Sequence, residues 1–383
     1  MDKCPKCGME LKDKHCTYCG YDPNKVVPKK DYKLLLYIII SILTICLSIE
    51  GSYLMAKKYS SNQTIKTVKD YSNITIDDTG IAGSVLKVYD SVVVIKTYVN
   101  DKLYATGTGF VFEEDDKYGY ILTNNHVIED GNKFKALFTN DEEVDIEVVG
   151  ADEYSDVAVL KVDKKYVLAV ASMGKSEDML VGDTTFAIGA PVDASTYSWT
   201  VTRGIISGKN RIVEVSGTNG SYVMNVLQTD TAINEGNSGG PLCNAKGEVI
   251  GVINMKMSSS KVEGIGFAIP IEVALEYANN FIKGEVIIRP YLGITMYDLS
   301  NSYFSRTQGI YIRSIENNSP AYKAGLRVGD IITKIGGKEV SSIAYLKYEL
   351  YKYNIGDEVE ITYKRDKEEK VTKVTLGSYE VRG

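Results

Sequence analysis

An apolar run from Leu34 to Met55 divides this chain of 383 residues into a short N-terminal piece and a long C-terminal piece. Its 22 residues carry one charge, Glu50. As a helix they would extend for about 33 Å, enough to cross a bilayer core of about 30 Å. We therefore expect a transmembrane helix at 33–55. A cleaved signal peptide is the alternative, but 33 residues precede the run and no A-x-A cleavage site follows it.

The N-terminal piece carries four of the six cysteines, in two C-x-x-C pairs that are each followed by a glycine. Thiolates at this spacing can converge on one tetrahedral ion, and so short a segment has no core that would order it without metal. We expect a zinc ribbon at 1–22, with structural Zn. Two disulfides or a redox-active pair are the alternatives, and His15 could substitute for one cysteine. The predicted ligands are Cys4, Cys7, Cys16 and Cys19.

The side of the membrane is predicted by the cysteines, because lysines flank both ends of the apolar run and do not fix its orientation. Zinc thiolates persist in a reducing cytoplasm. We expect a single-pass protein of the cell membrane with a cytoplasmic N-terminus. The part beyond the polar linker at 56–80 would then be extracytoplasmic.

Short β-branched runs separated by Gly, Asp and Asn fill the region 81–284. They predict an all-β barrel or sandwich, closed by one helix at 270–283. The apolar face of that helix would contain Val273, Leu275, Ala278 and Ile282. The remainder, 286–378, reads as a smaller module of short strands with two helices.

Charge and cysteine content exclude two classes of protein. The formal charge of −6 is spread along the chain, so no basic stripe could neutralise a phosphate backbone, and nucleic acid is not an expected partner. Only Cys46 and Cys243 lie beyond the first 19 residues, which excludes a disulfide framework for the bulk of the chain. We interpret Cys243 as a buried core thiol.

A general base near neutral pH is usually histidine, and the chain has only two. One of them, His126, follows a predicted strand in the segment T-N-N-H-V-I. An enzyme that uses a histidine base in this region must therefore use His126.

A serine nucleophile needs an exposed turn whose backbone N–H groups converge on one point, and G-N-S-G-G-P at 236–241 has that composition. Glycine lets the backbone adopt conformations that other residues avoid. We expect Ser238 to be the nucleophile, with an oxyanion hole formed by the loop of Gly236, Asn237 and Ser238.

An acid must fix the tautomer of the histidine, and Asp156 stands at the head of the apolar strand V-A-V-L-K. Burial at such a strand start suits that role. The rival carboxylates Asp152 and Asp163 lie in more polar turns, and Asp230 lies nearer the nucleophile loop.

The chain resembles the HtrA (DegP-like) serine proteases over about residues 81–378. The resemblance lies in the segments T-N-N-H-V-I, S-D-V-A-V-L-K, T-V-T-R-G-I-I-S and Q-T-D-T-A-I-N-E-G-N-S-G-G-P-L. The resemblance implies a mainly β fold, with a trypsin-like double β-barrel at 81–284 followed by a PDZ domain at 286–378. It also implies the triad His126, Asp156 and Ser238, no cofactor for catalysis, and a homotrimer.

The segment Tyr291, Leu292, Gly293 and Ile294 resembles a PDZ carboxylate-binding loop, in which successive N–H groups hold the C-terminus of a peptide. The S1 pocket, expected around 252–255 and 264–268, has no acidic residue, which predicts cleavage after small or medium aliphatic side chains.

The resemblance implies a membrane-anchored, ATP-independent serine endopeptidase that degrades unfolded or damaged extracytoplasmic proteins, whose C-termini the PDZ domain recognises. The alternatives are a scaffold or chaperone-like binding protein with a latent protease, and an enzyme regulated through a cytosolic zinc sensor.

Overall fold

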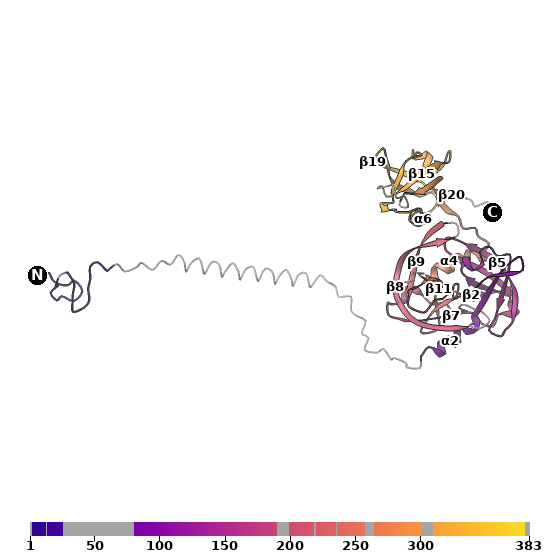
Figure 1. The fold of residues 1–383 in the computed structure, drawn as a ribbon, viewed down its shortest axis with the longest axis horizontal. Coiled ribbons are helices and arrows are strands. Elements are labelled where there is room, and N and C mark those ends of the chain that lie inside the picture. The colour runs from indigo at the N-terminus through magenta and orange to yellow at the C-terminus, as the bar shows by residue number, and fades with distance from the viewer. Residues whose placement is uncertain are drawn as a thin grey trace. The chain divides into compact units, whose positions relative to one another are not determined.

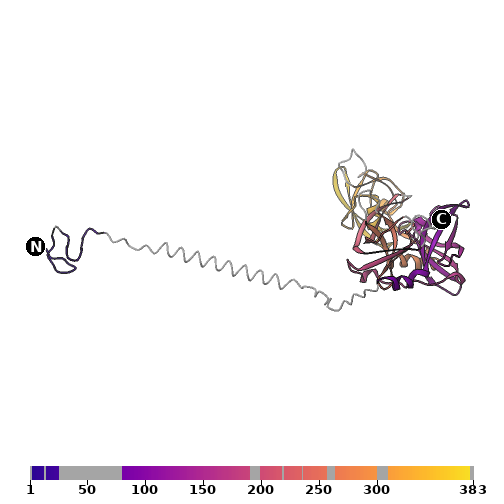
Figure 2. The same ribbon diagram turned by 60° about the horizontal axis from the view of Figure 1, so that its bottom comes forward.

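The computed structural model describes residues 2–12, 14–25, 80–189, 199–217, 220–234, 236–256, 264–299 and 309–379 (Figures 1 and 2). The chain divides into two compact units, Met1–Ile76 and Asp77–Gly383. The predicted transmembrane helix at 33–55 lies outside the described residues, as does the linker as far as residue 79. None of the described helices combines the length and apolar character needed to cross a bilayer.

The first unit contains two similar turns built on the two cysteine pairs. Gly8 N–H donates to the carbonyl of Cys4 at 2.8 Å, and Gly20 N–H donates to that of Cys16 at 2.9 Å. Both glycines have positive φ, +74° and +69°, a conformation in which a Cβ would be strained. The repeated turn brings the two pairs together.

The second unit begins with α2 (Ala82–Val88) and a first closed barrel of six antiparallel strands in the order β1-β2-β3-β6-β5-β4. Its interior is filled by β-branched and aliphatic residues such as Ile95, Ile121 and Leu160, which are fully buried. The strands are β1 (Val92–Val99), β2 (Lys102–Glu114), β3 (Tyr118–Thr123), β4 (Lys133–Leu137), β5 (Glu143–Asp152) and β6 (Val157–Asp163).

A second closed barrel follows in the order β10-β11-β12-β9-β8-β7. One apolar cluster contains residues of both barrels, among them Phe110 and Phe186, so the two barrels share a core at their junction. Cys243 lies in this cluster, fully buried, and burial raises the pKa of its thiol, as expected of a core residue. The strands are β7 (Thr184–Gly189), β8 (Thr200–Gly217), β9 (Gly220–Thr229), β10 (Pro241–Asn244), β11 (Val249–Lys256) and β12 (Gly266–Pro270).

Helix α4 (Ile271–Ile282) follows the second barrel and packs on the strands β5, β6 and β11. Its buried residues are Ile271, Ala274, Ala278 and Phe281. A Cβ on Gly150 would lie 2.5 Å from the ring of Phe281, so glycine allows this close approach. Val273, predicted on the apolar face, is 40% exposed, so that assignment was wrong.

The C-terminal module is a sheet in the order β14-β15-β16-β18-β19 with two short helices. Ser319 and Ser342 cap helices α5 (Pro320–Lys323) and α6 (Ile343–Leu350) by accepting the N–H groups of Tyr322 and Tyr345. The strands are β13 (Arg289–Tyr291), β14 (Ile294–Asp298), β15 (Ile310–Ile315), β16 (Ile331–Ile335), β17 (Lys338–Glu339), β18 (Glu358–Arg365), β19 (Glu368–Thr375) and β20 (Gly377–Tyr379). The mainly β fold predicted for both regions is thereby confirmed.

Candidate active site

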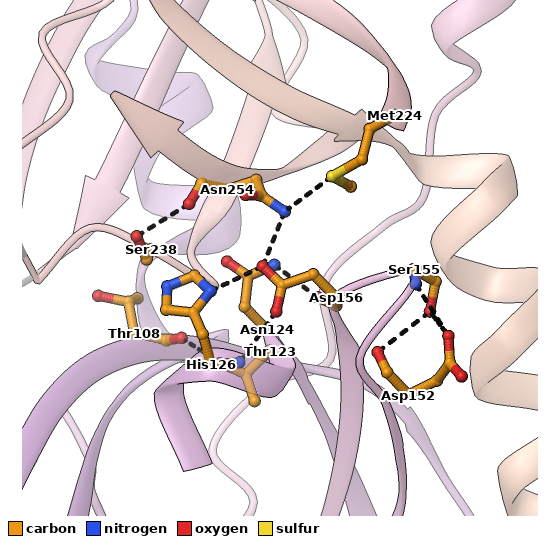
Figure 3. Close-up of polar contacts among 10 residues, drawn as sticks. All are labelled: Thr108, Thr123, Asn124, His126, Asp152, Ser155, Asp156, Met224, Ser238 and Asn254. Carbon is orange, nitrogen blue, oxygen red and sulfur yellow. Dashed lines mark hydrogen bonds and ion pairs between the residues drawn. The ribbon is translucent and has the colours of Figure 1, made fainter. Parts of the chain in front are cut away.

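His126 lies in α3 (Asn125–Ile128), the short helix that follows β3. Its Nδ1 lies 2.6 Å from Oδ2 of Asp156, and its backbone N–H donates to Oδ1 of the same carboxylate at 2.9 Å (Figure 3). Burial disfavours the imidazolium, but the hydrogen bond and the charge of Asp156 outweigh it and raise the pKa of His126 above 6.5. The side chain remains 39% exposed, so its other nitrogen can be reached by substrate.

Asp156 occupies the turn between β5 and β6 with a positive φ of +50°, which is uncommon for a residue other than glycine. The residue is 1% exposed, and the amide of Asn254 donates to its Oδ2 at 2.9 Å. Its backbone carbonyl accepts the amide of Asn124 at 2.9 Å. The carboxylate therefore accepts three hydrogen bonds while buried, and these fix its position beside the histidine.

The rival carboxylates have other partners. Asp152 accepts the N–H and hydroxyl of Ser155, both at 2.8 Å, and pairs with Arg289 at 2.6 Å. Asp163 accepts the N–H of Lys165, and Asp230 accepts that of Ile205. Asp156, by contrast, forms two hydrogen bonds with His126, so the geometry favours it as the acid.

Ser238 lies in the turn before β10, with its hydroxyl above the imidazole of His126 (Figure 3). The backbone of Ser238 is fixed by Thr108, whose N–H donates to the Ser238 carbonyl at 2.9 Å. The hydroxyl donates to the backbone carbonyl of Asn254 at 3.2 Å, its one hydrogen-bond partner in the part of the chain that the structure describes. The hydroxyl proton must therefore be redirected from this carbonyl before His126 can accept it.

The loop around the serine presents backbone donors. Asn237 N–H donates to the carbonyl of Asn234 at 3.0 Å, whereas the N–H groups of Gly236 and Ser238 have no acceptor among the described residues. The Gly236 carbonyl is held by the Thr108 hydroxyl at 2.6 Å, which fixes the orientation of the loop. Two free N–H groups on one tight turn can bind the oxyanion of a tetrahedral intermediate.

Gly239 shows why this turn requires glycine. Its φ is +83°, and a Cβ would lie 2.1 Å from Oγ1 of Thr123 and 2.2 Å from the carbonyl oxygen of Thr108. The nucleophile loop can therefore approach β2 and β3 only because this side chain is absent.

Three residues that form hydrogen bonds with the triad or with the nucleophile loop were not predicted from the sequence to do so: Asn254, Thr108 and Asn124. The segment V-I-N-M that contains Asn254 was assigned to the S1 wall. The hydrogen bond of its amide to Asp156 joins positions 98 residues apart, and that between Thr108 and Gly236 spans 128 residues. No local motif marks either contact.

The predicted metal ligands converge in the first unit. The sulfur atoms of Cys4, Cys7, Cys16 and Cys19 all lie within 4.8 Å of one another. The distances are 3.6 Å for Cys4–Cys19 and 3.5 Å for Cys7–Cys16, far longer than a disulfide bond. Zn–S bonds of about 2.3 Å at tetrahedral angles place sulfur atoms about 3.8 Å apart. The four thiols therefore fit a zinc ion.

The predicted carboxylate-binding loop borders a cavity of about 270 Å³. Leu292, Gly293 and Ile294 line it on one side, and Leu346 and Leu350 of α6 line it on another. Gly293 has a φ of +76°, and a Cβ there would lie 2.2 Å from Cβ of Ser319.

Two family models match the chain: a trypsin-like peptidase domain at residues 107–252 and a PDZ domain at 290–376. The relatives include the serine protease Do-like HtrB of Bacillus subtilis, 42% identical over 70% of this chain. The serine protease Do-like HtrA of Lactobacillus helveticus is 40% identical over 72% of this chain and 70% of its own length. The serine protease Do-like HtrA of Lactococcus lactis subsp. cremoris is 34% identical over 83% of this chain and 88% of its own length.

The match spans 61% of the length of the Bacillus subtilis HtrB protein and 64% of that of the HtrA protein of the same organism. Among solved structures, the serine endoprotease from Yersinia pestis is 30% identical, with a TM-score of 0.58 over 79% of this chain and 99% of its own. The HtrA-type protease AlgW with a decapeptide is 28% identical, with a TM-score of 0.59 over 78% of this chain and 99% of its own.

Proposed function

Because the chain belongs to the HtrA family of serine proteases, with a trypsin-like peptidase domain and a PDZ domain, we propose that it is an ATP-independent serine endopeptidase of unfolded or damaged extracytoplasmic proteins. One observation carries this proposal: the buried Asp156 carboxylate holds His126 by two hydrogen bonds, next to a serine on a glycine-rich turn.

In the proposed reaction, His126 Nε2 takes the proton of the Ser238 hydroxyl as Oγ attacks the scissile carbonyl carbon. The electron pair of the C=O bond moves to the oxygen, and the N–H groups of Gly236 and Ser238 stabilise that charge. The protonated His126 then gives its proton to the amine as the peptide bond breaks. Water, activated by His126 in the same way, hydrolyses the acyl-enzyme and restores the serine.

The choice of substrate would be made at two places. Among the residues expected around the S1 pocket, Val252, Ile253, Phe267 and Ala268 are apolar and buried, which supports cleavage after small or medium aliphatic residues. The cavity beside Leu292–Ile294 supports recognition of apolar C-termini by the PDZ domain.

We also propose that the N-terminal ribbon binds one structural Zn through its four cysteines, and that 33–55 anchors the chain in the cell membrane. The sulfur geometry supports the first point. The apolar run supports the second, with the ribbon cytoplasmic and the protease and PDZ domains outside. A homotrimer is proposed from family membership.

A second function, a scaffold or chaperone-like protein with a latent protease, is favoured by one observation. The Ser238 hydroxyl is bonded to Asn254 and has no described hydrogen bond to His126. Such a protein would bind unfolded chains through the PDZ domain without cutting them.

The test is proteolysis of unfolded casein by the full chain in detergent, beside Ser238→Ala. Loss of the nucleophile is expected to reduce turnover by about 10⁶. If wild type and variant are both inactive, also with a peptide bound to the PDZ domain, the scaffold function replaces the protease function.

A further inference from the structure

We propose that the outer part of β2 binds the substrate chain beyond the scissile bond, and that Tyr104 selects apolar side chains there. The proposal rests on the protease function and adds a place of substrate choice on the leaving side of the cut. Two features carry it: a free strand edge beside the nucleophile, and a bulge that exposes two adjacent apolar side chains.

Strand β2 passes directly beside the catalytic groups. Thr108 N–H donates to the carbonyl of Ser238 at 2.9 Å. One residue earlier, a Cβ on Gly107 would lie 2.6 Å from Cγ1 of Val127 and 3.3 Å from the Ser238 carbonyl oxygen. Val127 follows His126 in α3. The strand therefore runs from the base and the nucleophile outward to the hairpin with β1, and its residues change from buried to exposed along the way.

One edge of this segment is free. Strand β2 pairs with β1 from Lys102 to Phe110, and with β3 only from Phe110 onward. In an antiparallel pair, residues that bond the partner strand alternate with residues whose N–H and C=O groups point away. Thr108 points away from β1, because its N–H goes to Ser238. Thr106, two positions earlier, therefore also points away, and no described strand pairs with it on that edge.

The leaving side of the substrate lies along this edge. In the proposed reaction His126 gives its proton to the departing amine, so the amine is on the His126 side of Ser238. The expected S1 wall, around 252–255 and 264–268, belongs to the second barrel, whereas His126 and β2 belong to the first. A substrate held in S1 therefore continues along β2 beyond the cut, where its backbone can pair with Thr106 as an added strand.

The outer end of β2 carries a bulge. Thr97 pairs with Ala105, and Tyr98 pairs with Leu103. Tyr104 stands between these two partners and has none of its own on β1. Bulges re-aim side chains and are over-represented next to active sites. Tyr104 is 60% exposed and Leu103 is 55% exposed, so the bulge presents an apolar surface beside the free edge.

The place of the bulge determines which substrate residue it contacts. Tyr104 precedes Thr108, which is bonded to Ser238, by four positions. Strand residues rise by about 3.3 Å each, so Tyr104 lies about 13 Å along the strand, beside about the fourth substrate residue after the cut. An apolar side chain there would cover the ring. Unfolded chains expose such side chains, whereas folded proteins bury most of them.

The test gives two substrates to the full chain in detergent. One is an internally quenched peptide with leucine at the third to fifth positions after the scissile bond and an amidated C-terminus, which offers no carboxylate to the PDZ domain. The other is a nitroanilide with the same residues before the cut and no amino acid after it. We expect Tyr104→Ser to lower kcat/KM for the peptide about 5- to 20-fold, as for loss of a partly buried aromatic contact. The nitroanilide should be cleaved as by wild type.

A change in the peptide tests the same contact from the other side. Serine in place of the three leucines should lower the wild-type kcat/KM by a similar factor, with little further loss in Tyr104→Ser, because both changes remove one interaction. Tyr104→Phe keeps the ring and should behave as wild type. Tyr322→Ser is the matched control, because Tyr322 is a tyrosine of similar exposure, 53%, on α5 of the PDZ domain.

An unchanged kcat/KM for the quenched peptide in Tyr104→Ser would overturn the proposal. An equal loss on the nitroanilide would do so too, because it would show that the residue supports the fold without binding substrate. A changed oligomeric state of Tyr104→Ser in light scattering would instead assign the surface to a contact between copies of the chain.

Peptide binding separates this proposal from the protease function. If wild type cuts neither substrate, the protease function fails, and the affinity of the amidated peptide for Ser238→Ala decides the role of Tyr104. Adding Tyr104→Ser to that variant should weaken binding about 5- to 20-fold. Equal affinity of the two variants contradicts the proposal.

Discussion

Asp156 contacts His126 through both of its carboxylate oxygens: Oδ2 lies 2.6 Å from the imidazole Nδ1, and Oδ1 accepts the backbone N–H at 2.9 Å. The second bond fixes the start of the helix that carries the histidine, so the acid orients both the ring and the chain that bears it. The positive φ of Asp156 lets the residue turn toward α3 while β6 begins at the next position.

Asp156→Asn should lower the turnover of casein by about 10⁴, because an amide cannot hold the imidazole in the tautomer that accepts the serine proton. The exposed Asp163→Asn, which changes a carboxylate at the other end of β6, should retain wild-type turnover. Turnover of Asp156→Asn within tenfold of wild type would mean that another acid orients His126.

The acid limb of proteolysis should have its midpoint above pH 6.5, because His126 must be neutral to act as a base and Asp156 raises its pKa. The same shift affects stability with the opposite sign. The protonated His126 stabilises the fold below its unfolded pKa of about 6.5, and this contribution is lost as pH rises through the higher folded value. The rate of proteolysis between pH 5 and 9 tests the first expectation, and urea unfolding over the same range tests the second. An acid limb of the rate with its midpoint below pH 6.5 would refute the electrostatic argument.

Gly239→Ala should abolish activity and destabilise the protein by several kcal/mol, because its Cβ would overlap Thr123 and the Thr108 carbonyl. Gly182→Ala is a matched control: Gly182 has a similar φ, +99°, with no atom within 4 Å of the added Cβ. Backbone strain alone should cost about 1–2 kcal/mol there. Equal losses of unfolding free energy in the two variants would show that the contact with β2 and β3 has no effect.

One zinc ion per chain is expected from elemental analysis, and Cys4→Ser with Cys7→Ser should abolish its binding. His15→Gln should keep the metal, because Nε2 of His15 lies 3.0 Å from Asp22 and the four sulfur atoms already complete a tetrahedron. A metal-free N-terminus with two disulfides would contradict the ribbon.

The candidate triad was predictable from the sequence because each member lies in a short segment with its own chemistry: the second of only two histidines, a carboxylate before an apolar strand, and a serine in a glycine-rich turn. The β-rich character of both regions was predictable from β-branched runs and turn residues, which are local signals, whereas the double β-barrel and the PDZ domain were predicted from the family resemblance. The periodicity of α4 was less informative. Its register against two barrels buries Ile271, Ala274 and Phe281, and a helical pattern alone does not decide which neighbouring residue, such as Val273, is left outside.

The contacts of Asn254 and Thr108 had no such signal, because they arise only when the two barrels close on each other. Asparagine and threonine are ordinary strand-end and strand residues, and neither spacing nor composition distinguishes those that meet a catalytic group. The predicted S1 wall includes the segment that contains Asn254, but this prediction did not identify the partner of its amide.

The hydrogen bond from Ser238 to the Asn254 carbonyl also has a consequence for the time course of the reaction. Redirecting the hydroxyl from this carbonyl toward His126 is a side-chain rotation, and such rotations take picoseconds to nanoseconds. Protease turnover is slower by many orders of magnitude, with typical enzymes completing about 1–10³ cycles per second. The resting contact therefore cannot delay a catalytic cycle; it can only set the fraction of molecules whose serine is ready when a substrate arrives.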